Sequence, residues 1–516
     1  MSWYVINTDG GWYSYPAYAL SQGRDPDENL LPPDELSLAT PGVRSLFQWD
    51  NRGFLLTRIH WAWFEIAGEG AWSIRIFGLL QWLGLAVLIG LAVYRSGGNA
   101  WASGAAAIAA LSDSKLIHES LADLRPDIPL AVTAVASLLF LILYIRRRSA
   151  VSLGACAVLL ALLPLIHTTG VLPAAMLLTC LATFALIPHD GRFSRSHMLA
   201  AALIAGGVLA VFLLRQPILD VLIPSRVPVT LQVSGRHDLP VLLEQVAHRG
   251  VGWKVVKEAH RWSGYFAGAN FAQLLFLAGG LLLLLWRAWQ RRLTSQEQLC
   301  LAVGWVVGVL VLTFTDPHFT PTHMIPLIAL GYVMAGVGWA MPLGEPNAPR
   351  AAARAHARAM MALCVLAALA FALKAAEAAS EIYRGTRQHV GGAEVRALLA
   401  KAFPATGVTW TVGPTSIWLY APHGGTPVIL DERSDPGIVH SQLWKRVGVL
   451  VVDSDFLHYG WENVVRQGVA QRWLTPIGEV GKPGGIYFLE AFRVGHPAAA
   501  RAAIRPTGDA SSHPAP

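Results

Sequence analysis

The residues best suited to do chemistry in this sequence form four polar groups separated by long apolar runs. The first contains Asp9, which stands among aromatic residues and directly before Gly10 and Gly11. Two glycines allow close approach of the backbone, as a loop packed against a ligand requires. A carboxylate in such a loop is a candidate general base for a hydroxyl group. A lone carboxylate on such a loop is usually a solvated surface charge.

The second group, with Glu119, Asp123, Arg125 and Asp127, lies in a short segment between two apolar runs. Glu119 and Asp123 are four residues apart and share one face if the segment is helical. Pro126 suits the first turn of the next helix. Ionisable side chains at membrane depth are candidates for a functional site, although an ordinary connecting loop can have the same composition.

The third group, with Asp316, His318 and His323, comes directly before another apolar run. Histidines five residues apart favour a phosphate or carboxylate partner over a metal, because a helical metal pair has a spacing of three or four. Hydrogen bonds to the backbone explain these histidines equally well. The fourth and weakest group is made of Arg58, His60 and His167.

Composition places these groups in a membrane protein. Of the 516 residues, 54% are hydrophobic and 14% are charged, whereas a soluble domain carries roughly 25% charged residues. The 19 tryptophans fit the bilayer interface, which indoles favour. The sequence therefore predicts an α-helical polytopic membrane protein with about ten spans: 72–94, 98–115, 126–145, 150–166, 170–187, 197–214, 271–288, 298–314, 322–341 and 359–375.

Arginines mark alternate connections between these runs: Arg95, Arg146, Arg147, Arg148, Arg192, Arg195, Arg287, Arg291, Arg292, Arg350, Arg354 and Arg358. The positive-inside rule places this set in the cytoplasm and the four polar groups outside. The net charge of +7 then reflects topology and not nucleic-acid binding, and an anionic lipid substrate stays compatible with it. Because residues 1–70 are external with no helix before them, we expect one spanning helix to be missing upstream of Met1.

Within the segment 215–270, the sequence predicts helices at Leu239–His248 and Val251–Trp262. In the C-terminal part it predicts short strands at Val408–Val412, Pro427–Leu430, Val447–Val452 and Gly485–Leu489.

The expected domains follow from this topology. They are an external loop at 1–70 with the acidic motif and an interfacial helix at Ile59–Ile66, a transmembrane domain at 71–376 with an external loop at 215–270, a small external α/β domain at 377–496 and a disordered tail at 497–516. The four cysteines show no CxxC spacing and are interpreted as packing residues. The hydrolase, metalloprotease and P-loop motifs GxSxG, HExxH and GxxxxGK[ST] are absent from the sequence.

In order and spacing, four short motifs resemble the GT-C fold integral-membrane glycosyltransferases, such as aminoarabinose transferases, protein O-mannosyltransferases and rhizobial core glycosyltransferases. The motifs are Thr8-Asp9-Gly10 leading to Tyr18-Ala19-Leu20-Ser21-Gln22-Gly23, then Gly70-Ala71-Trp72-Ser73-Ile74-Arg75-Ile76-Phe77-Gly78, Leu124-Arg125-Pro126-Asp127 and His323-Met324-Ile325-Pro326-Leu327. Gly10 stands where that group usually has a second acid, which weakens the expectation of a bound metal.

The resemblance implies transfer of a sugar from a polyprenyl-phosphate donor to a lipid, glycan or protein acceptor at the outer face of a bacterial inner membrane. Asp9 would be the catalytic base. The donor phosphate would be bound by Arg125, His318 and His323, with Arg58 as a further candidate. Asp127 and Glu119 would orient the acceptor or hold a divalent cation. The candidates for stacking on a sugar ring are Trp12, Trp61 and Trp63.

Two other classes of function stay open. A flippase or transporter of a lipid-linked sugar usually needs polar residues near the middle of the bilayer, and the apolar runs here carry almost no charge in their middles. A non-catalytic envelope assembly or sensor protein would use the C-terminal domain for binding, and the acids at 9 and 127 would then be dispensable.

Overall fold

The computed structural model of the chain describes residues 14, 16–18, 20–21, 23, 49–97, 99–123, 125–186, 195–214, 239–266, 270–289, 296–315, 321–340, 355, 358–359, 361–362, 364–374, 376, 392–402, 408–412, 427–430, 439, 444, 447–453, 461–481 and 488–495. The chain forms two compact units. A helical unit comprises Ile6–Pro26 and Gln48–Gly385, and a sheet unit comprises Thr386–Pro516 with two short N-terminal segments.

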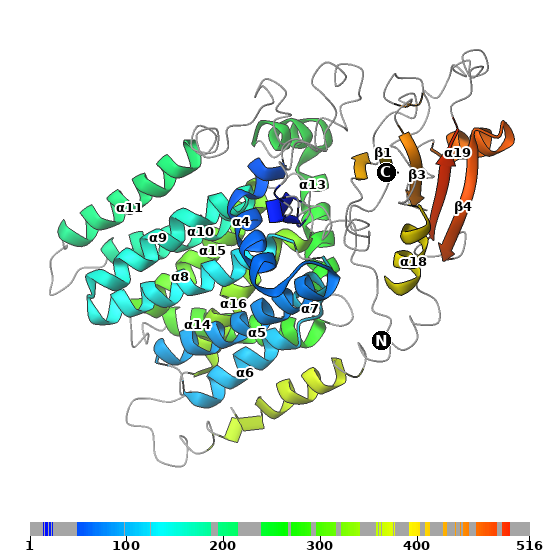
Figure 1. The fold of residues 1–516 in the computed structure, drawn as a ribbon. Coiled ribbons are helices and arrows are strands. Elements are labelled where there is room, and N and C mark those ends of the chain that lie inside the picture. The colour runs from blue at the N-terminus through cyan, green and yellow to red at the C-terminus, as the bar shows by residue number, and fades with distance from the viewer. Residues whose placement is uncertain are drawn as a thin grey trace. The chain divides into compact units, whose positions relative to one another are not determined.

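The described part of the helical unit is built largely from apolar helices (Figure 1). Its elements are α4 (Trp49–Ala67), α5 (Ala71–Arg95), α6 (Ala100–Leu111), α7 (Ser114–His118), the π-helix η1 (Glu119–Asp123), α8 (Asp127–Arg147), α9 (Ala150–Ile166), the 3₁₀ turn η2 (Thr168–Gly170), α10 (Val171–Leu186), α11 (Arg195–Leu213), α13 (Leu239–Phe266), α14 (Phe271–Trp289), α15 (Gln296–Thr315), the 3₁₀ turn η5 (Pro321–Met324) and α16 (Ile325–Ala340).

Each of the ten predicted runs overlaps an apolar helix, but the helices differ in length. Among the described residues, four are long and apolar enough to cross a membrane: Trp72–Arg95, Asp127–Arg147, Arg195–Leu213 and Thr322–Ala340. The count becomes five if the bent pair Val246–Phe266 and Phe271–Trp286 forms one span. The shorter apolar helices are Ala100–Leu111, Ala150–Ile166, Val171–Leu186, Leu301–Thr313 and Cys364–Lys374.

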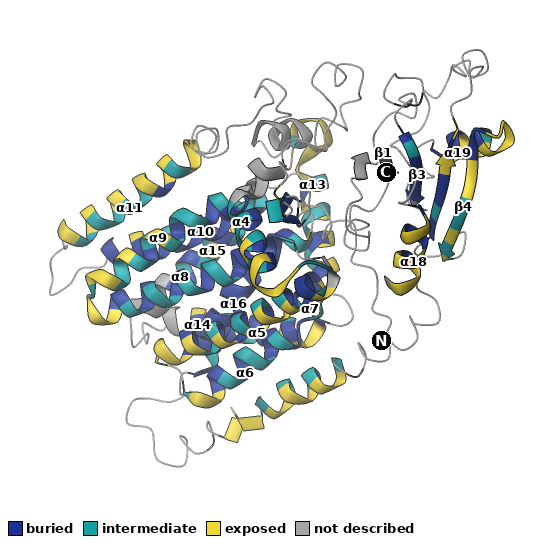
Figure 2. Cartoon of the chain, in the orientation of Figure 1, coloured by how far each residue is buried: buried dark blue, intermediate teal, exposed yellow. Residues whose placement is uncertain are grey.

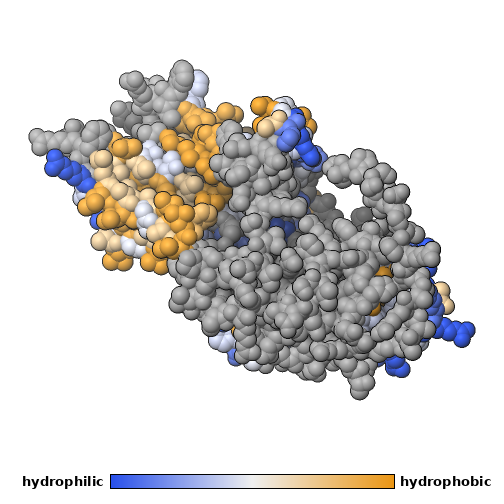
Figure 3. Space-filling model, turned by 90° about the horizontal axis from the view of Figure 1, so that it is seen from above, coloured by the Kyte–Doolittle hydropathy of each residue, from blue (hydrophilic) through white to orange (hydrophobic). Residues whose placement is uncertain are grey.

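The core of the helical unit surrounds α16, which is buried along almost its whole length and packs against α5, α6, α8, α14 and α15. Glycines permit this close packing, as is common between membrane helices. A Cβ atom on Gly338 would lie only 2.0 Å from the carbonyl oxygen of Gly280 on α14. By contrast, α11 exposes large apolar residues such as Leu199 and Leu203 (Figure 2). On the side of α11, a broad hydrophobic surface is visible in Figure 3, as expected for contact with lipid.

Two local predictions for the helical unit can be compared directly with the structure. The predicted helices at Leu239–His248 and Val251–Trp262 correspond to one element, α13, that is interrupted at Gly250, where φ is +81°. Only glycine adopts this backbone conformation without strain. The interfacial helix predicted at Ile59–Ile66 is part of the longer α4.

The sheet unit contains a five-stranded sheet with the strand order β2-β1-β3-β5-β4. Its elements are α18 (Gly392–Ala402), β1 (Val408–Val412), β2 (Pro427–Leu430), β3 (Val447–Asp453), α19 (Trp461–Ala470), β4 (Leu474–Gly481) and β5 (Phe488–Val494). Strand β1 pairs in parallel with β2 and β3, and β5 pairs antiparallel with β3 and β4.

The sequence predicts β1, β2 and β3 correctly but misses β4 and begins the last strand too early, at residue 485. Pro476, Gly478 and Gly481 lie in β4, and these residue types usually argue against a strand. Because β4 is at the edge of the sheet, it tolerates a proline that would remove a hydrogen bond from a central strand.

Candidate active site

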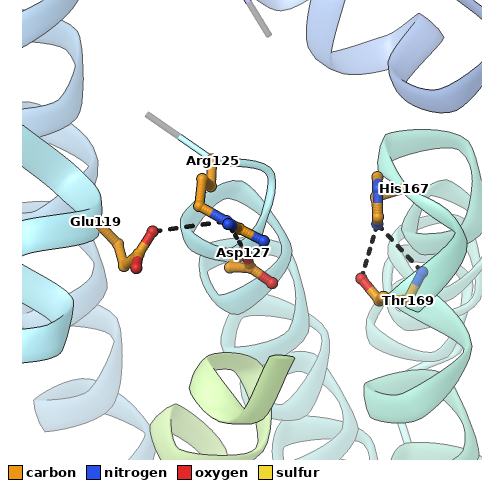
Figure 4. Close-up of polar contacts among 5 residues, drawn as sticks. All are labelled: Glu119, Arg125, Asp127, His167 and Thr169. Carbon is orange, nitrogen blue, oxygen red and sulfur yellow. Dashed lines mark hydrogen bonds and ion pairs between the residues drawn. The ribbon is translucent and has the colours of Figure 1, made fainter. Parts of the chain in front are cut away.

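Two acids and one arginine meet between α7 and α8. The Nε atom of Arg125 lies 3.2 Å from Oδ2 of Asp127 and 3.7 Å from Oε2 of Glu119 (Figure 4). Both carboxylates are almost completely buried, whereas the arginine side chain keeps 17% of its surface exposed. Asp127 is the first residue of α8, where the helix dipole favours a negative charge. The structure thus brings together three of the predicted site residues.

One guanidinium serves both carboxylates in this acid–arginine group. Buried charges need such partners, since an unpaired one carries a large desolvation cost. The geometry does not favour a cation held by Glu119 and Asp127 alone, because the guanidinium lies within 4 Å of both. Among the residues that the structure describes, no group of three His, Cys, Asp or Glu side chains is placed to hold a metal ion.

His167 and Thr169 form a second polar turn near the beginning of α8. Nδ1 of His167 accepts a hydrogen bond from the Thr169 backbone N–H at 3.3 Å and lies 2.8 Å from the Thr169 hydroxyl. Gly170 packs closely here, because a Cβ atom at this position would lie 2.3 Å from the Leu163 carbonyl oxygen and 3.1 Å from a methyl group of Leu130, in the first turn of α8. Figure 4 shows this turn beside the acid–arginine group.

Of the predicted residues on α4, Trp63 joins α4 to α5, and the contacts that Trp61 makes with Arg58 and Glu65 lie within α4. The indole N–H of Trp63 donates to the Ser73 carbonyl at 2.8 Å, and its ring packs against Phe77. Trp61 donates to Glu65 at 3.1 Å, and the Arg58 guanidinium lies 6.0 Å from the Trp61 ring centroid. Sugar stacking by Trp61 and Trp63 and phosphate binding by Arg58 stay predictions.

Asp9, Trp12 and His318 lie outside the described residues. The closest described part of the chain to Asp9 is a helical segment around Tyr18, whose neighbour Ser21 donates a hydrogen bond to Oε1 of Glu69 at 2.6 Å. Glu69 lies in the turn between α4 and α5. The segment that follows Asp9 is therefore attached to the helical unit at this turn.

A row of charged residues on α13 was not among the predicted site residues. Nζ of Lys254 lies 2.7 Å from Oε1 of Glu258, and Arg261 pairs with the other oxygen of Glu258 through Nε, at 3.1 Å, and Nη2. Lys254 and Arg261 are both buried. The buried side of α13 packs against α15 and η5, and η5 carries the predicted residue His323. The spacing of 254, 258 and 261 on one helical face is the signal that could have revealed this row.

Asp113 accepts hydrogen bonds from five donors and was also not predicted. It is fully buried and caps the N-terminus of α7 by accepting from the backbone N–H groups of Lys115 and Leu116. The hydroxyls of Tyr265 and Tyr332 donate to its Oδ2 at 3.0 and 2.8 Å. One carboxyl group thus joins α7, the end of α13 and the middle of α16.

A second layer of hydrogen bonds surrounds Asp113. The side chain of Asn270 donates to Oδ1 of Asp113 at 3.1 Å and accepts from the Ser114 backbone at 2.9 Å. Gln273, in the first turn of α14, donates to the Ser112 carbonyl at 2.9 Å. These bonds fix α7 to the bend between α13 and α14. Because α7 leads directly into η1, the Asp113 network positions Glu119 relative to the charged row on α13.

The sequence matches no protein-family model and no curated protein. The structure is similar to ArnT from Cupriavidus metallidurans in the apo state, with a TM-score of 0.55, 14% identity and coverage of 95% of this chain and 94% of that chain. ArnT from the same organism bound to undecaprenyl phosphate gives a TM-score of 0.54, again at 14% identity and with the same coverage. The oligosaccharyltransferase of Archaeoglobus fulgidus in complex with Zn and sulfate gives 0.48 at 12% identity, over 93% of this chain and 69% of that chain.

The chain therefore has the GT-C fold of integral-membrane glycosyltransferases, which confirms the resemblance predicted from the sequence. In particular, it shares the fold of the aminoarabinose transferase ArnT over nearly the whole length of both chains.

Proposed function

We propose that this protein is a glycosyltransferase that moves a sugar from a polyprenyl-phosphate donor to a lipid, glycan or protein acceptor. The observation that carries this proposal is the buried group of Glu119, Arg125 and Asp127 at one end of the bundle, in a fold shared with ArnT. One of the ArnT structures is bound to undecaprenyl phosphate, which supports a donor of this chemical class.

The proposed reaction is a displacement at the anomeric carbon of the sugar. The acceptor hydroxyl attacks this carbon, its proton passes to the carboxylate of Asp9, and the bond to the donor phosphate breaks. The phosphate leaves with additional negative charge, which nearby cations stabilise. We assign this role to Arg125, His323, His318 and Arg58, and we add Lys254 and Arg261 because they lie on the α13 face that packs against η5.

Glu119 and Asp127 have two tasks in this proposal. They hold the Arg125 guanidinium in place through the two ion pairs, and they orient the acceptor. A divalent cation at these acids would require Arg125 to move away, because its Nε is within 4 Å of both.

The arrangement of helix ends supports an external location for the proposed site. Asp127 and Arg147 lie at opposite ends of the 21-residue α8, about 30 Å apart at about 1.5 Å per residue. The arginine-rich ends gather at the far end: Arg148 lies over the Phe184 ring of α10, 4.3 Å from its centroid. With these arginines in the cytoplasm of a bacterial cell, the site lies on the external face of the inner membrane.

Binding of the donor phosphate tests this assignment. Purified protein in lipid nanodiscs is titrated with undecaprenyl phosphate and, separately, with undecaprenol, and the bound lipid is measured by native mass spectrometry. We expect selective binding of the phosphate and at least a tenfold loss of affinity in Arg125→Gln, whereas Arg148→Gln at the opposite end has no effect. Equal binding of the two lipids, or equal effects of the two variants, would overturn the assignment of the phosphate to this end.

The fate of the donor lipid distinguishes the proposed transferase from a flippase. A flippase moves the lipid-linked sugar across the bilayer with its glycosidic phosphate bond intact, whereas a transferase releases free polyprenyl phosphate. Mass spectrometry of lipids from proteoliposomes distinguishes these products. A non-catalytic assembly protein changes neither the donor nor its location.

A further inference from the structure

Between Val251 and Arg261, α13 has charged side chains on its buried face and apolar side chains on its exposed face, whereas Tyr265 and Phe266 at its end are buried. Its exposed face carries Val251, Val255 and Val256, which are 70%, 61% and 67% exposed. Its buried face carries the charged side chains of Lys254 and Arg261. A helix that borders water shows the opposite pattern, with charges outside and apolar residues inside. The exposed valines therefore indicate an apolar environment around this face.

The bend after α13 sets the direction of α13 relative to α14. Val246–Phe266 and Phe271–Trp286 meet at 112°, and Asn270 and Tyr265 tie this bend to Asp113. Beyond the bend, α14 exposes large apolar residues such as Leu275 and Leu282, as a helix surrounded by lipid does. If α14 crosses the bilayer, a helix nearly perpendicular to it lies along the membrane plane.

The charges of α13 also argue against a span. Arg249, Lys254, Lys257, Glu258 and Arg261 fall within about four turns of helix, and charged residues are rare in the hydrocarbon region. Near the break at Gly250, the Arg249 guanidinium lies 5.1 Å from the centroid of the Trp253 ring. Tryptophan and arginine are both typical of the membrane interface.

We infer that α13, from Val251 to Phe266, lies in the interfacial layer of the bilayer with its valine face buried among lipid chains. The exposed apolar surface of α14 continues this lipid contact beyond the bend. In this position the row of Lys254, Glu258 and Arg261 faces the end of the bundle at the depth of lipid headgroups. The inference is independent of the reaction that the protein catalyses, because it rests on burial, charge and the bend alone.

Depth-dependent fluorescence quenching tests this inference on the full chain in nanodiscs. Single cysteines labelled with an environment-sensitive dye replace Val255, Val158 or Val469, in a background without the native cysteines. Val158 is an exposed position on the apolar α9, and Val469 is an exposed position on α19 of the sheet unit. These two sites serve as references for lipid chains and for water.

We expect the dye at Val255 to be quenched more strongly by lipids carrying a spin label near the headgroup than by lipids labelled deep in the chain. The dye at Val158 should show the reverse order, and the dye at Val469 should respond only to water-soluble iodide. Quenching at Val255 by iodide alone would overturn the inference, and so would protection from both lipid labels and iodide, because a protein surface would then cover the valines.

A photo-crosslinking amino acid at Val256 provides a second measurement that keeps the native cysteines. We expect ultraviolet light to attach a phospholipid at this position, as identified by mass spectrometry of the peptide. Attachment to a peptide of the sheet unit or of a second copy of the chain would contradict the inference.

Discussion

Removal of the Asp113 carboxyl group should abolish folding of the helical unit. Asp113→Ala takes the acceptor away from five buried donors: two backbone amides of α7, the side-chain amide of Asn270 and the hydroxyls of Tyr265 and Tyr332. Each buried donor left without a partner costs roughly 1–3 kcal/mol. The sum is on the order of 5 kcal/mol or more, which approaches the total stability of about 5–15 kcal/mol for a typical protein.

Milder changes at the same place should give graded losses. Tyr332→Phe removes one hydrogen bond and should lower the free energy of unfolding by about 1–2 kcal/mol. Tyr94→Phe is the matched control, because Tyr94 is exposed. This substitution should change the free energy of unfolding by no more than about 0.5 kcal/mol. Asp113→Asn keeps one carbonyl acceptor for the α7 cap and should be intermediate between Tyr332→Phe and Asp113→Ala.

Reversible unfolding of the full chain in lipid bicelles measures these differences. The reasoning is refuted if Tyr332→Phe and Tyr94→Phe have the same stability, or if Asp113→Ala folds with a stability within about 1 kcal/mol of the unaltered chain.

Three further changes test other parts of the structure. Gly170→Ala should destabilise the helical unit by about 1–3 kcal/mol, as overpacking of a core does, whereas Gly154→Ala, which meets open space, should be neutral or slightly stabilising in the same unfolding assay. Arg125→Gln leaves two buried carboxylates without their guanidinium and should cost about 3–5 kcal/mol; a loss below about 1 kcal/mol would show that water already solvates these acids. Burial and the neighbouring carboxylate of Glu479 raise the pKa of Glu490. The folded chain then holds this proton more tightly than the unfolded chain, so the sheet unit should lose stability as the pH rises from the ordinary glutamate pKa through the raised one. Glu490→Gln should remove this loss. At pH 7 the amide hydrogens of β4 and β5 should then exchange more slowly in Glu490→Gln than in the unaltered chain, and at pH 4 the two chains should exchange at the same rate.

The sequence predicts the helical architecture well because apolar runs report burial and lipid contact directly. It also predicts the acid–arginine group, since Arg125 and Asp127 are only two residues apart and Glu119 is in the same connection. Residues this close along the chain can be predicted to lie together without any knowledge of long-range packing. Asp9 and His318 lie outside the described residues, and their roles stay predictions.

The Asp113 network could not be predicted in the same way. Asp113 is a single acid at the end of an apolar run, and its partners Tyr265 and Tyr332 lie 152 and 219 residues away along the chain. The charged row on α13 was missed for a related reason. Lysine, glutamate and arginine on one helical face usually indicate a solvated surface, and only the fold shows that this face is buried.

Donor cleavage is the measurement that tests the proposed reaction most directly. The protein is reconstituted in proteoliposomes with lipid-linked sugars and acceptor lipids extracted from bacterial envelopes, and both lipid pools are followed by mass spectrometry. We predict that free polyprenyl phosphate and a glycosylated acceptor appear together in equal amounts, and that Asp9→Asn abolishes both while the protein remains folded. Release of polyprenyl phosphate at an unchanged rate in Asp9→Asn, or movement of intact lipid-linked sugar across the bilayer with no cleavage, would contradict the account.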